Sequence, residues 1–418
     1  MSKRLTIGLF GFGVVGQGLH DIISTKDLNI EIKKIAIKNP EKDRILPEHL
    51  FTTNPDDILN DPSINTVIEL INDADAAYEI VTRALKSKKN VVSANKKMIA
   101  EHLDELVNLQ KKYNTSLLYE GAVCGSIPII RNLEEYYDNE LLHSISGIFN
   151  GSSNFILSKI ANEGLEYSHA LKQAQDLGFA EKDPILDVGG YDPKYKLVIA
   201  AAHAYGIFVK PEEILNIGIQ NFSTLDLHFA QEHQLKIKLV PTAKKLDDKE
   251  IALYVIPKLI PKSDFLYNVE NEYNAVSVKA AFADQQLFYG KGAGGHPTGS
   301  AVLSDVAALR YDYRYEYKKY HHDKRLKLQN DHVIPIYIRY NHESLIHDIH
   351  FEFIAEQHKS TALKYVLGGV KISELIAKKQ KILDDGAFIA QAGALTEKFK
   401  ELNLKRPEPS PLKKKILH

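Results

Sequence analysis

The stretch GFGVVG, directly after the apolar run Leu5–Phe10, constrains the fold of this chain more than any other feature. Its glycines have G-x-G-x-x-G spacing, and an amphipathic segment and a second strand-like run, Ile30–Asn39, follow. A strand, a glycine turn, a helix and another strand form the context in which this motif binds a dinucleotide. The alternative is a glycine-rich turn in another kind of α/β domain. We predict that the coenzyme site includes Gly11, Phe12, Gly13, Val14, Val15 and Gly16.

The end of the run Ile30–Asn39 discriminates between the two nicotinamide coenzymes. An acidic residue there would bind the ribose 2′-hydroxyl of NAD. This chain has Lys38 and Asn39 instead, with Arg44 nearby and no acid before Glu41. Because a lysine can bind a 2′-phosphate, the sequence favours NADP, and use of both coenzymes stays open.

Strands and helices continue to alternate as far as residue 131. The runs TVIELI, NVVSANK and SLLYEG have strand length, and helical segments separate them. This alternation favours a parallel, doubly wound sheet, in which ligands bind at the carboxyl ends of the strands. Asn95, Lys96 and Glu120 fall at such ends. For Lys96 alone, an exposed lysine after a strand is the simpler interpretation.

The middle of the chain carries a second set of polar residues. In NGSSN, residues 150–154, Ser153 or Asn154 is expected to cap a helix that begins near Phe155. The run YKLVIAAAHAYG indicates a helix with Asp192 near its N-terminus and Lys196 one turn later. Taken alone, the two residues are explained by a helix cap and an i,i+4 surface ion pair. A second glycine-rich segment, residues 290–310, is expected to return to the nucleotide-binding region, with a helix from residue 300 onward.

The segment AQDLGFAEKDPILDVGGYDPKYK, residues 174–196, resembles the signature of homoserine dehydrogenases. The resemblance also takes in GFGVVG, the Ser-Ala-Asn-Lys stretch, the loop Glu120–Pro128, NGSSNFIL and GAGGHPTGSAVLSD. It implies the reversible reduction of L-aspartate 4-semialdehyde to L-homoserine by NAD(P)H, a step towards threonine and methionine. The runner-up is an oxidoreductase acting on another semialdehyde or amino acid. A third possibility is an inactive nucleotide-sensing paralogue, against which the presence of Lys96, Asp192 and Lys196 argues.

The same resemblance implies roles for individual residues. Lys96 and Lys196 would serve the proton transfer. The substrate would be bound by Glu181 and Asp192, together with Asn150, Gly151 and Ser152. Lys38, Asn95 and Gly292 would join the glycine turn in binding the coenzyme. A structural sodium ion would be held by backbone carbonyls of Val123, Gly125 and Ile127, near Glu120.

These residue types suit the reduction of an aldehyde. Hydride delivery to the carbonyl carbon leaves charge on oxygen, so a nearby acid must supply a proton. A lysine can do so when a dry pocket or a second lysine lowers its pKa, which is our expectation for the pair. Three departures from the family pattern affect affinity more than reaction type: Lys182 for a proline, Phe179 for a tyrosine, and Ile71–Asp73 without the usual glycine pair.

Composition limits the partners of the chain. Its 418 residues are 44% hydrophobic, and its net charge of -1 argues against nucleic acid or an anionic membrane surface. The single cysteine, Cys124, rules out an internal disulfide and suits a reducing compartment. Glycines interrupt the first apolar run and no cleavage site follows, so we expect a cytoplasmic enzyme rather than a secreted one.

We therefore expect a Rossmann domain from residues 1–131 and 291–318, and an α+β substrate and dimerisation domain from 132–290. A linker, 319–332, would lead to a small α+β domain, 333–418, of ACT-like or degenerate regulatory type. In that domain we expect strands at VIPIYIRY and IHFEFIA, a helix at residues 360–367 and a helical C-terminus. A homodimer is expected by analogy with the family. Because no kinase-like segment precedes residue 1, we also expect the monofunctional type.

Overall fold

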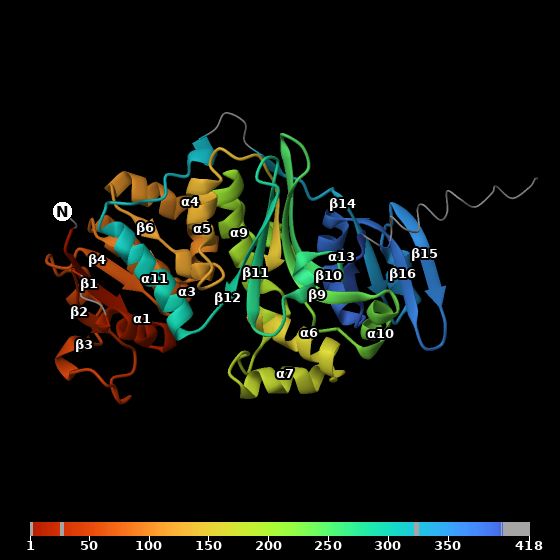
Figure 1. Ribbon diagram of the computed structural model, residues 1–418, viewed down its shortest axis with the longest axis horizontal. Coiled ribbons are helices and arrows are strands. Elements are labelled where there is room, and N and C mark those ends of the chain that lie inside the picture. The colour runs from red at the N-terminus through yellow and green to blue at the C-terminus, as the bar shows by residue number, and fades with distance from the viewer. Residues whose placement is uncertain (1–2, 26–28, 322–325, 394, 396–418) are drawn as a thin grey trace, which may run out of the picture.

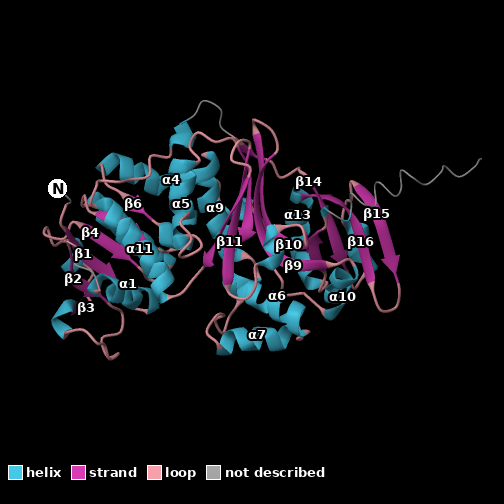
Figure 2. Cartoon of the chain, viewed as in Figure 1, coloured by secondary structure: helices cyan, strands magenta, loops and turns pink. Residues whose placement is uncertain are grey.

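The computed structural model describes residues 3–25, 29–321, 326–393 and 395. Two β-sheets follow one another along the long axis of the molecule (Figure 1). The sheet at the N-terminal end is covered by helices, whereas the strands of the other run from the centre to the opposite end (Figure 2). This arrangement confirms a parallel-sheet nucleotide domain beside a separate mixed-sheet part.

The N-terminal sheet has six parallel strands in the order β3-β2-β1-β4-β5-β6. Its strands are β1 (Leu5–Phe10), β2 (Ile30–Ala36), β3 (Phe51–Thr52), β4 (Thr66–Glu69), β5 (Asn90–Ser93) and β6 (Leu117–Leu118). Its helices are α1 (Val14–Ser24), α2 (Asp56–Leu59), α3 (Ala74–Lys86), α4 (Lys96–Tyr113) and α11 (Gly295–Leu309). The order reverses between β1 and β4, which is where doubly wound sheets bind their ligands.

Local sequence explains this half of the fold. Every residue of β4 is buried, as expected for a strand covered by helices on both faces. The side chain of Asp73 caps α3 by accepting the N–H groups of Asp75 and Ala76. Helix α11 packs on α1 so closely that a Cβ added to Gly18 would lie 2.4 Å from the carbonyl carbon of Gly295. The second glycine-rich segment thus lies beside the first.

The larger sheet is mixed and has eleven strands, with the main order β12-β11-β7-β9-β10-β17-β14-β16-β15. Strands β8 and β13 also pair with β10. The strands are β7 (Leu142–Ile148), β8 (Leu215–Asn216), β9 (Leu235–Lys245), β10 (Glu250–Pro261), β11 (Tyr273–Ala280), β12 (Gln285–Lys291), β13 (Lys327–Leu328), β14 (Val333–Arg339), β15 (Phe353–Lys359), β16 (Lys364–Lys371) and β17 (Phe388–Gln391). Lys258 of β10 pairs with Gln391 of β17, so the C-terminal strands continue this sheet.

One buried helix lies between the two halves. The remaining helices are α5 (Ile129–Arg131), α6 (Gly151–Glu163), α7 (Tyr167–Asp176), α8 (Ile185–Val188), α9 (Tyr191–Tyr205), α10 (Thr224–Glu232), α12 (Glu343–Asp348) and α13 (Ile372–Asp384). Helix α9 contacts α4 on one side and β9 on the other. All its residues except Tyr191 are buried, which explains its nearly uninterrupted apolar run after Lys196. Polar residues in its first two turns are therefore held inside the molecule.

Several predicted elements are wrong in detail. The second half of the helix expected at 360–367 is instead the start of strand β16, because the run Tyr365–Val370 is buried between β14 and β15 and its glycines allow close approach of Phe353. The helix after the NGSSN cluster begins at Gly151, and its cap is Asn150 rather than Ser153 or Asn154. Helix α11 begins five residues before the expected start. Most of the C-terminus expected to be helical, 396–418, lies outside the described residues.

The range predicted as a linker, 319–332, contains the short strand β13.

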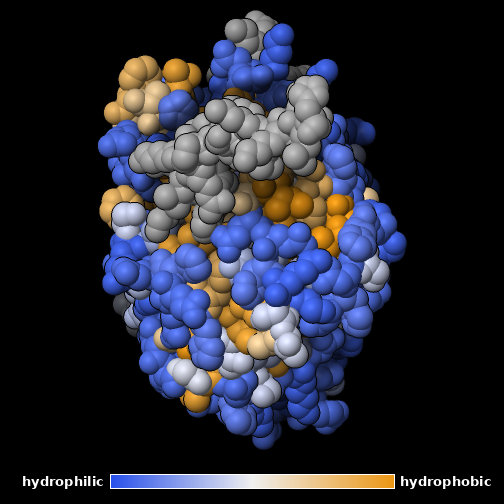
Figure 3. Space-filling model, turned by 90° about the vertical axis from the view of Figure 1, so that its right-hand side faces the viewer, coloured by the Kyte–Doolittle hydropathy of each residue, from blue (hydrophilic) through white to orange (hydrophobic). Residues whose placement is uncertain are grey.

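The end of the molecule opposite the parallel sheet is predominantly hydrophilic, with hydrophobic areas between the charged side chains (Figure 3). In the described ranges, no helix combines the length and apolar character that crossing a membrane requires.

Candidate active site

A cavity of about 220 Å³ lies at the carboxyl ends of the parallel strands. Val15 lines it from α1, Lys96 from α4, Lys196 from α9 and Gly292 from the segment after β12. The cavity therefore joins the glycine turn to both predicted catalytic lysines. Cys124 also lines it, and burial raises the pKa of this thiol to about 11, so the thiol is protonated near neutral pH.

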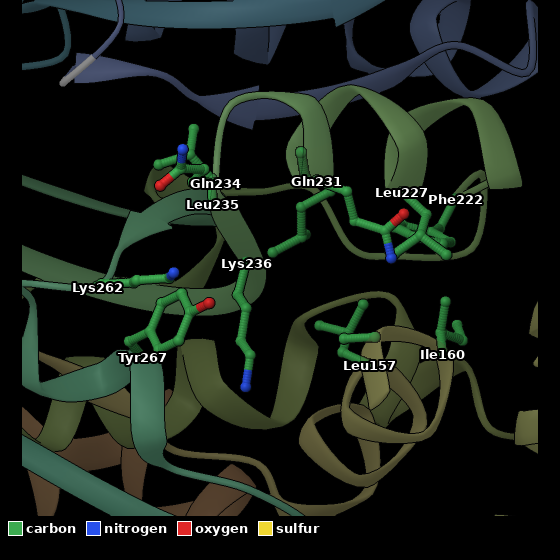
Figure 4. Close-up of a pocket in the computed structure, with 13 residues that line it drawn as sticks. Leu157, Ile160, Phe222, Leu227, Gln231, Gln234, Leu235, Lys236, Lys262 and Tyr267 are labelled. Atoms are coloured by element: carbon green, nitrogen blue, oxygen red, sulfur yellow. The ribbon is translucent and has the colours of Figure 1, made fainter. Parts of the chain in front are cut away.

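A second cavity, of about 230 Å³, lies elsewhere and contains none of the predicted site residues. Its walls are apolar side chains such as Leu157 of α6 and Leu227 of α10, with Lys236 and Tyr267 at one side (Figure 4). The chemistry expected from the sequence therefore belongs to the first cavity.

The three glycines of GFGVVG have three different surroundings. Gly11 has a φ of +94°, in the region that favours glycine. Gly13 precedes α1, and a Cβ added there would meet nothing within 4 Å, whereas one added to Gly16 would lie 2.5 Å from the carbonyl oxygen of Gly11. The start of α1 thus has open space beside Gly13, and the first N–H groups of a helix, which have no partner within it, suit a pyrophosphate. These residues fit a dinucleotide.

The other predicted coenzyme residues differ in their surroundings. Phe12 is buried against Phe51, whereas Val14 is exposed. Lys38 is exposed just beyond the end of β2. Asn95 caps α4 by accepting the N–H of Met98, and its amide nitrogen donates to the carbonyl of Ile71 at 3.1 Å. Both ends of the Asn95 amide therefore already have backbone partners.

Asp192 lies between the two predicted catalytic lysines. Its Oδ1 is 2.8 Å from Nζ of Lys96, and its Oδ2 is 2.8 Å from Nζ of Lys196. The Asp192 and Lys196 side chains are only 5% and 8% exposed, so their pairing is no surface ion pair. Lys196 also donates to the carbonyl of Phe149 at 2.6 Å. Two helices and the end of β7 thus fix this constellation.

The charges of this group set its protonation. Burial opposes ionisation of Asp192, but the two ammonium groups outweigh it and hold the pKa of this carboxyl below its usual range. The charge of Asp192 raises the pKa of Lys96. We expected a dry pocket or the second lysine to lower the pKa of Lys96, and this expectation is wrong. The charge of the aspartate between the lysines outweighs the effect of burial on that pKa. Lys96 is consequently an ammonium ion near neutral pH, ready to donate a proton.

Asn150 links this group to a carboxylate that we did not predict. Its Nδ2 donates to Asp187 at 2.6 Å and to Asp192 at 2.9 Å, while its Oδ1 accepts the N–H of Ser153. Burial and the nearby charge of Asp192 raise the pKa of Asp187 to about 6. Asp187 stands in the segment that resembles the family signature, but only the fold shows that one amide holds both carboxylates.

The remaining predicted substrate residues surround this group less closely. Glu181 is exposed, and its charge contributes to the raised pKa of Lys96. The hydroxyl of Ser152 donates to the carbonyl of Phe179. Gly151 begins α6, where an added Cβ would lie 2.6 Å from the carbonyl oxygen of Glu272. Glu181 is thus the one of the three whose side chain is free to meet a substrate ammonium group.

Glu120 and its loop do not form an obvious metal centre. The carboxylate accepts the N–H groups of Ile130 and Arg131 at 2.8 and 3.0 Å. The carbonyl of Ile127 accepts the N–H of Ile129. Within the described ranges, no three His, Cys, Asp or Glu side chains are grouped to hold a metal ion. A sodium site made of carbonyls, with Val123 and Gly125, needs no such group and stays a prediction.

Comparison with known proteins identifies the family. The model of the homoserine dehydrogenase NAD-binding domain matches residues 11–120, and the homoserine dehydrogenase model matches residues 128–307. The chain belongs to the homoserine dehydrogenase family. It is therefore an oxidoreductase with an NAD(P)-binding Rossmann domain, as the sequence predicts.

Individual homoserine dehydrogenases agree with this assignment. The chain is 37% identical to the Bacillus subtilis enzyme over 322 residues and 40% identical to the Helicobacter pylori enzyme over 317. These alignments cover 75% and 74% of this chain, and 74% of each relative. The crystal structure of the Thiobacillus denitrificans enzyme matches with a TM-score of 0.78 and 30% identity, covering 91% of this chain and 95% of that one. A hyperthermophilic archaeal homoserine dehydrogenase in complex with NADPH matches with a TM-score of 0.65 and 26% identity, over 75% of this chain and 99% of that one.

Proposed function

We propose that this site reduces the aldehyde of L-aspartate 4-semialdehyde to the primary alcohol of L-homoserine, reversibly, as a step towards threonine and methionine. Bound NAD(P)H supplies the hydride. The observation that carries the proposal is the Lys96–Asp192–Lys196 group, in which Asp192 and Lys196 are buried, beside a cavity that reaches the glycine turn. It combines a proton source with a coenzyme site.

In this proposal each side chain has a separate task. The aldehyde carbon gains the hydride, and its oxygen gains a proton from the ammonium group of Lys96 or Lys196. Asp192 keeps Lys96 charged and, with Asn150, holds the lysines in place. Glu181 meets the substrate ammonium group, which needs a carboxylate partner. Solvent at the half-exposed Lys96 then replaces the proton.

The test uses the purified full-length chain. NADPH absorbance should fall when L-aspartate 4-semialdehyde is added, and L-homoserine should form. Oxidation of NADPH with a different semialdehyde but not with this one would favour the runner-up, a related oxidoreductase. Binding of NADPH without turnover of any semialdehyde would favour the inactive sensing protein.

We also propose that the coenzyme preference favours NADP through Lys38. The guanidinium of Arg44 donates to the carbonyls of Asn39 and Lys42 at 2.6 and 2.5 Å and lies 5.3 Å from the Phe51 ring centre. Arg44 therefore holds the loop after β2, which leaves the exposed Lys38 to meet a 2′-phosphate. Replacing Lys38 with Glu should lower kcat/KM for NADPH relative to NADH, whereas Lys112→Glu, at the exposed end of α4, should leave the ratio unchanged. An unchanged ratio in Lys38→Glu would contradict this role.

Three further parts of the proposal concern a bound ion, the assembly and the cellular compartment. Sodium would be held by the carbonyls of Val123, Gly125 and Ile127 near Glu120, which predicts a higher melting temperature in sodium chloride than in choline chloride.

A homodimer would use the edge of the large sheet, where Leu287 is partly exposed on β12. Sedimentation should then give twice the mass of the chain. A cytoplasmic location fits the single buried cysteine, and cell fractionation tests it.

A further inference from the structure

Two lysines from distant parts of the chain converge on one amide oxygen. Nζ of Lys194, on α9, lies 2.9 Å from Oδ1 of Asn216, and Nζ of Lys379, on α13, lies 3.0 Å from the same atom. Both nitrogens also lie 5.0 Å from the ring centre of Tyr191. Asn216 belongs to β8, which pairs with β10 of the large sheet. A single side chain thus connects α13 to the start of α9.

Neutral groups, rather than carboxylates, hold these two cations. No described carboxylate lies within ion-pair distance of either lysine: the Asn216 oxygen and the Tyr191 ring contact them, and the charges of Glu212 and Glu101 act on Lys194 from further away. Burial and the charge of Lys379 lower the pKa of Lys194 to about 8. Keeping two cations together has an electrostatic cost. The hydrogen bonds that both lysines donate to the Asn216 oxygen offset part of this cost.

The other end of the Asn216 amide reaches the turn before Asp192. Its Nδ2 donates to the carbonyl of Gly189 at 2.8 Å. Gly190, with a φ of +78°, follows and is the N-cap of α9, which carries Asp192 in its first turn. The neighbouring segment fits tightly, because a Cβ added to Gly218 would lie 2.6 Å from Cα of Gly189. The position of Asp192 therefore depends on a turn that Asn216 holds.

The two lysines also determine which way the amide faces. An ammonium group only donates hydrogen bonds, so the Asn216 oxygen must face the lysines and its nitrogen must face Gly189. If the amide turned over, its oxygen would oppose the Gly189 carbonyl. Neither aspartate nor leucine can replace this asparagine, since the position needs an acceptor on one side and a donor on the other.

We propose that Asn216 is a positioning residue for the reaction, which holds the turn that orients Asp192, and that Lys379 of α13 holds Asn216. Helix α13 is then part of the structure that aligns the catalytic group. This inference rests on the proposed function for its kinetic test. It has a second test that does not depend on activity.

The kinetic test uses four variants. Asn216→Asp keeps the shape and the acceptor but cannot donate to Gly189, so kcat should fall about 10–100-fold while KM for NADPH stays within about twofold. Lys379→Met should lower kcat about 3–10-fold, because Lys194 still faces the oxygen, and Lys379→Arg should restore most of it. The control is Lys381→Met, on the same helix but paired with Asp348 and 64% exposed. It should match the wild type.

The second test is hydrogen exchange of the peptide that spans residues 188–194, measured by mass spectrometry. Exchange should be faster in Asn216→Asp and Lys379→Met than in the wild type and in Lys381→Met. Unchanged exchange and unchanged kcat in folded Asn216→Asp would overturn the inference. The inference would also be overturned if Lys379→Met lost kcat, coenzyme binding and melting temperature together and Lys379→Arg failed to restore them. Such a result would indicate general destabilisation. If the wild type lacks activity, the proposed function fails, and the exchange data alone decide the inference.

Discussion

The carboxylate of Asp192 lies 2.8 Å from the ammonium group of Lys196, one turn further along α9, and both side chains are almost fully buried. Breaking a buried ion pair by removing one partner leaves an uncompensated charge, which is more costly than losing an exposed pair. The pair therefore fixes Lys196 at the cavity wall. The other oxygen of the same carboxylate pairs with Lys96 and holds it beside the same cavity.

Asp192→Asn should move the alkaline limit of activity to lower pH. The aspartate charge raises the pKa of Lys96 in the native protein, so removing it favours the neutral amine and lowers that pKa. The neutral amine cannot supply a proton, and activity should be lost at a lower pH than in the wild type. The pH profile of kcat measures this shift.

Asp183→Asn is the matched control for that variant, because Asp183 lies nine residues earlier, before α8, and is exposed. Its pH profile should keep the wild-type alkaline limit. An Asp192→Asn profile with an unmoved limit would show that Lys96 is not the group whose titration limits the reaction.

Gly13→Ala and Gly16→Ala should have opposite kinds of effect. Gly13 has ordinary backbone angles and open space at its Cβ, so Gly13→Ala should fold normally but raise KM for NADPH, where the methyl group meets the pyrophosphate. Gly16→Ala would place its Cβ 2.5 Å from the Gly11 carbonyl, so its free energy of unfolding should fall by about 1–3 kcal/mol. Urea unfolding and coenzyme titration separate the two. Normal coenzyme affinity in Gly13→Ala would contradict the placement of the pyrophosphate.

Glu69 should make the native protein less stable as pH rises. Burial raises the pKa of this carboxyl from 4.5 to about 7, although Ser93 and the N–H of Ile71 donate to it. Its contribution to stability is complete below the unfolded-state pKa and is lost as pH rises through 7, a difference of about 3 kcal/mol.

Glu69→Gln, which cannot ionise, should remove this part of the pH dependence in urea unfolding. Glu79→Gln, at an exposed position on α3, should retain it. Equal slopes in Glu69→Gln and the wild type would mean that Glu69 does not titrate in this range.

The residues of the candidate site could be predicted from the sequence where local pattern and chemistry coincide. The spacing of GFGVVG between two strands predicted the turn, and the family resemblance pointed to Asp192 and Lys196. Their helix and its i,i+4 pairing follow from local sequence. Burial of the pair depends on α4 and β9, which lie far from α9 in the chain. Local sequence alone is equally compatible with an exposed ion pair.

Other features required the fold. Asn150 binds two carboxylates that approach from a different segment, so its amide could not be assigned from spacing. The start of strand β16 was mistaken for a helix because burial between two neighbouring strands, rather than periodicity, decides its conformation. The prediction that the pKa of Lys96 is lowered is wrong for a similar reason. The charge of Asp192, which raises that pKa, comes from another helix.

The most direct test of the account is turnover of L-aspartate 4-semialdehyde with NADPH by the Lys96→Met and Lys196→Met variants. Each should lower kcat roughly 10²–10⁴-fold, the usual contribution of a positioned proton donor. Lys97→Met should behave as the wild type, because Lys97 pairs with Glu101 outside the cavity. Wild-type kcat in both folded variants would contradict the claim that the lysines joined by Asp192 supply the proton.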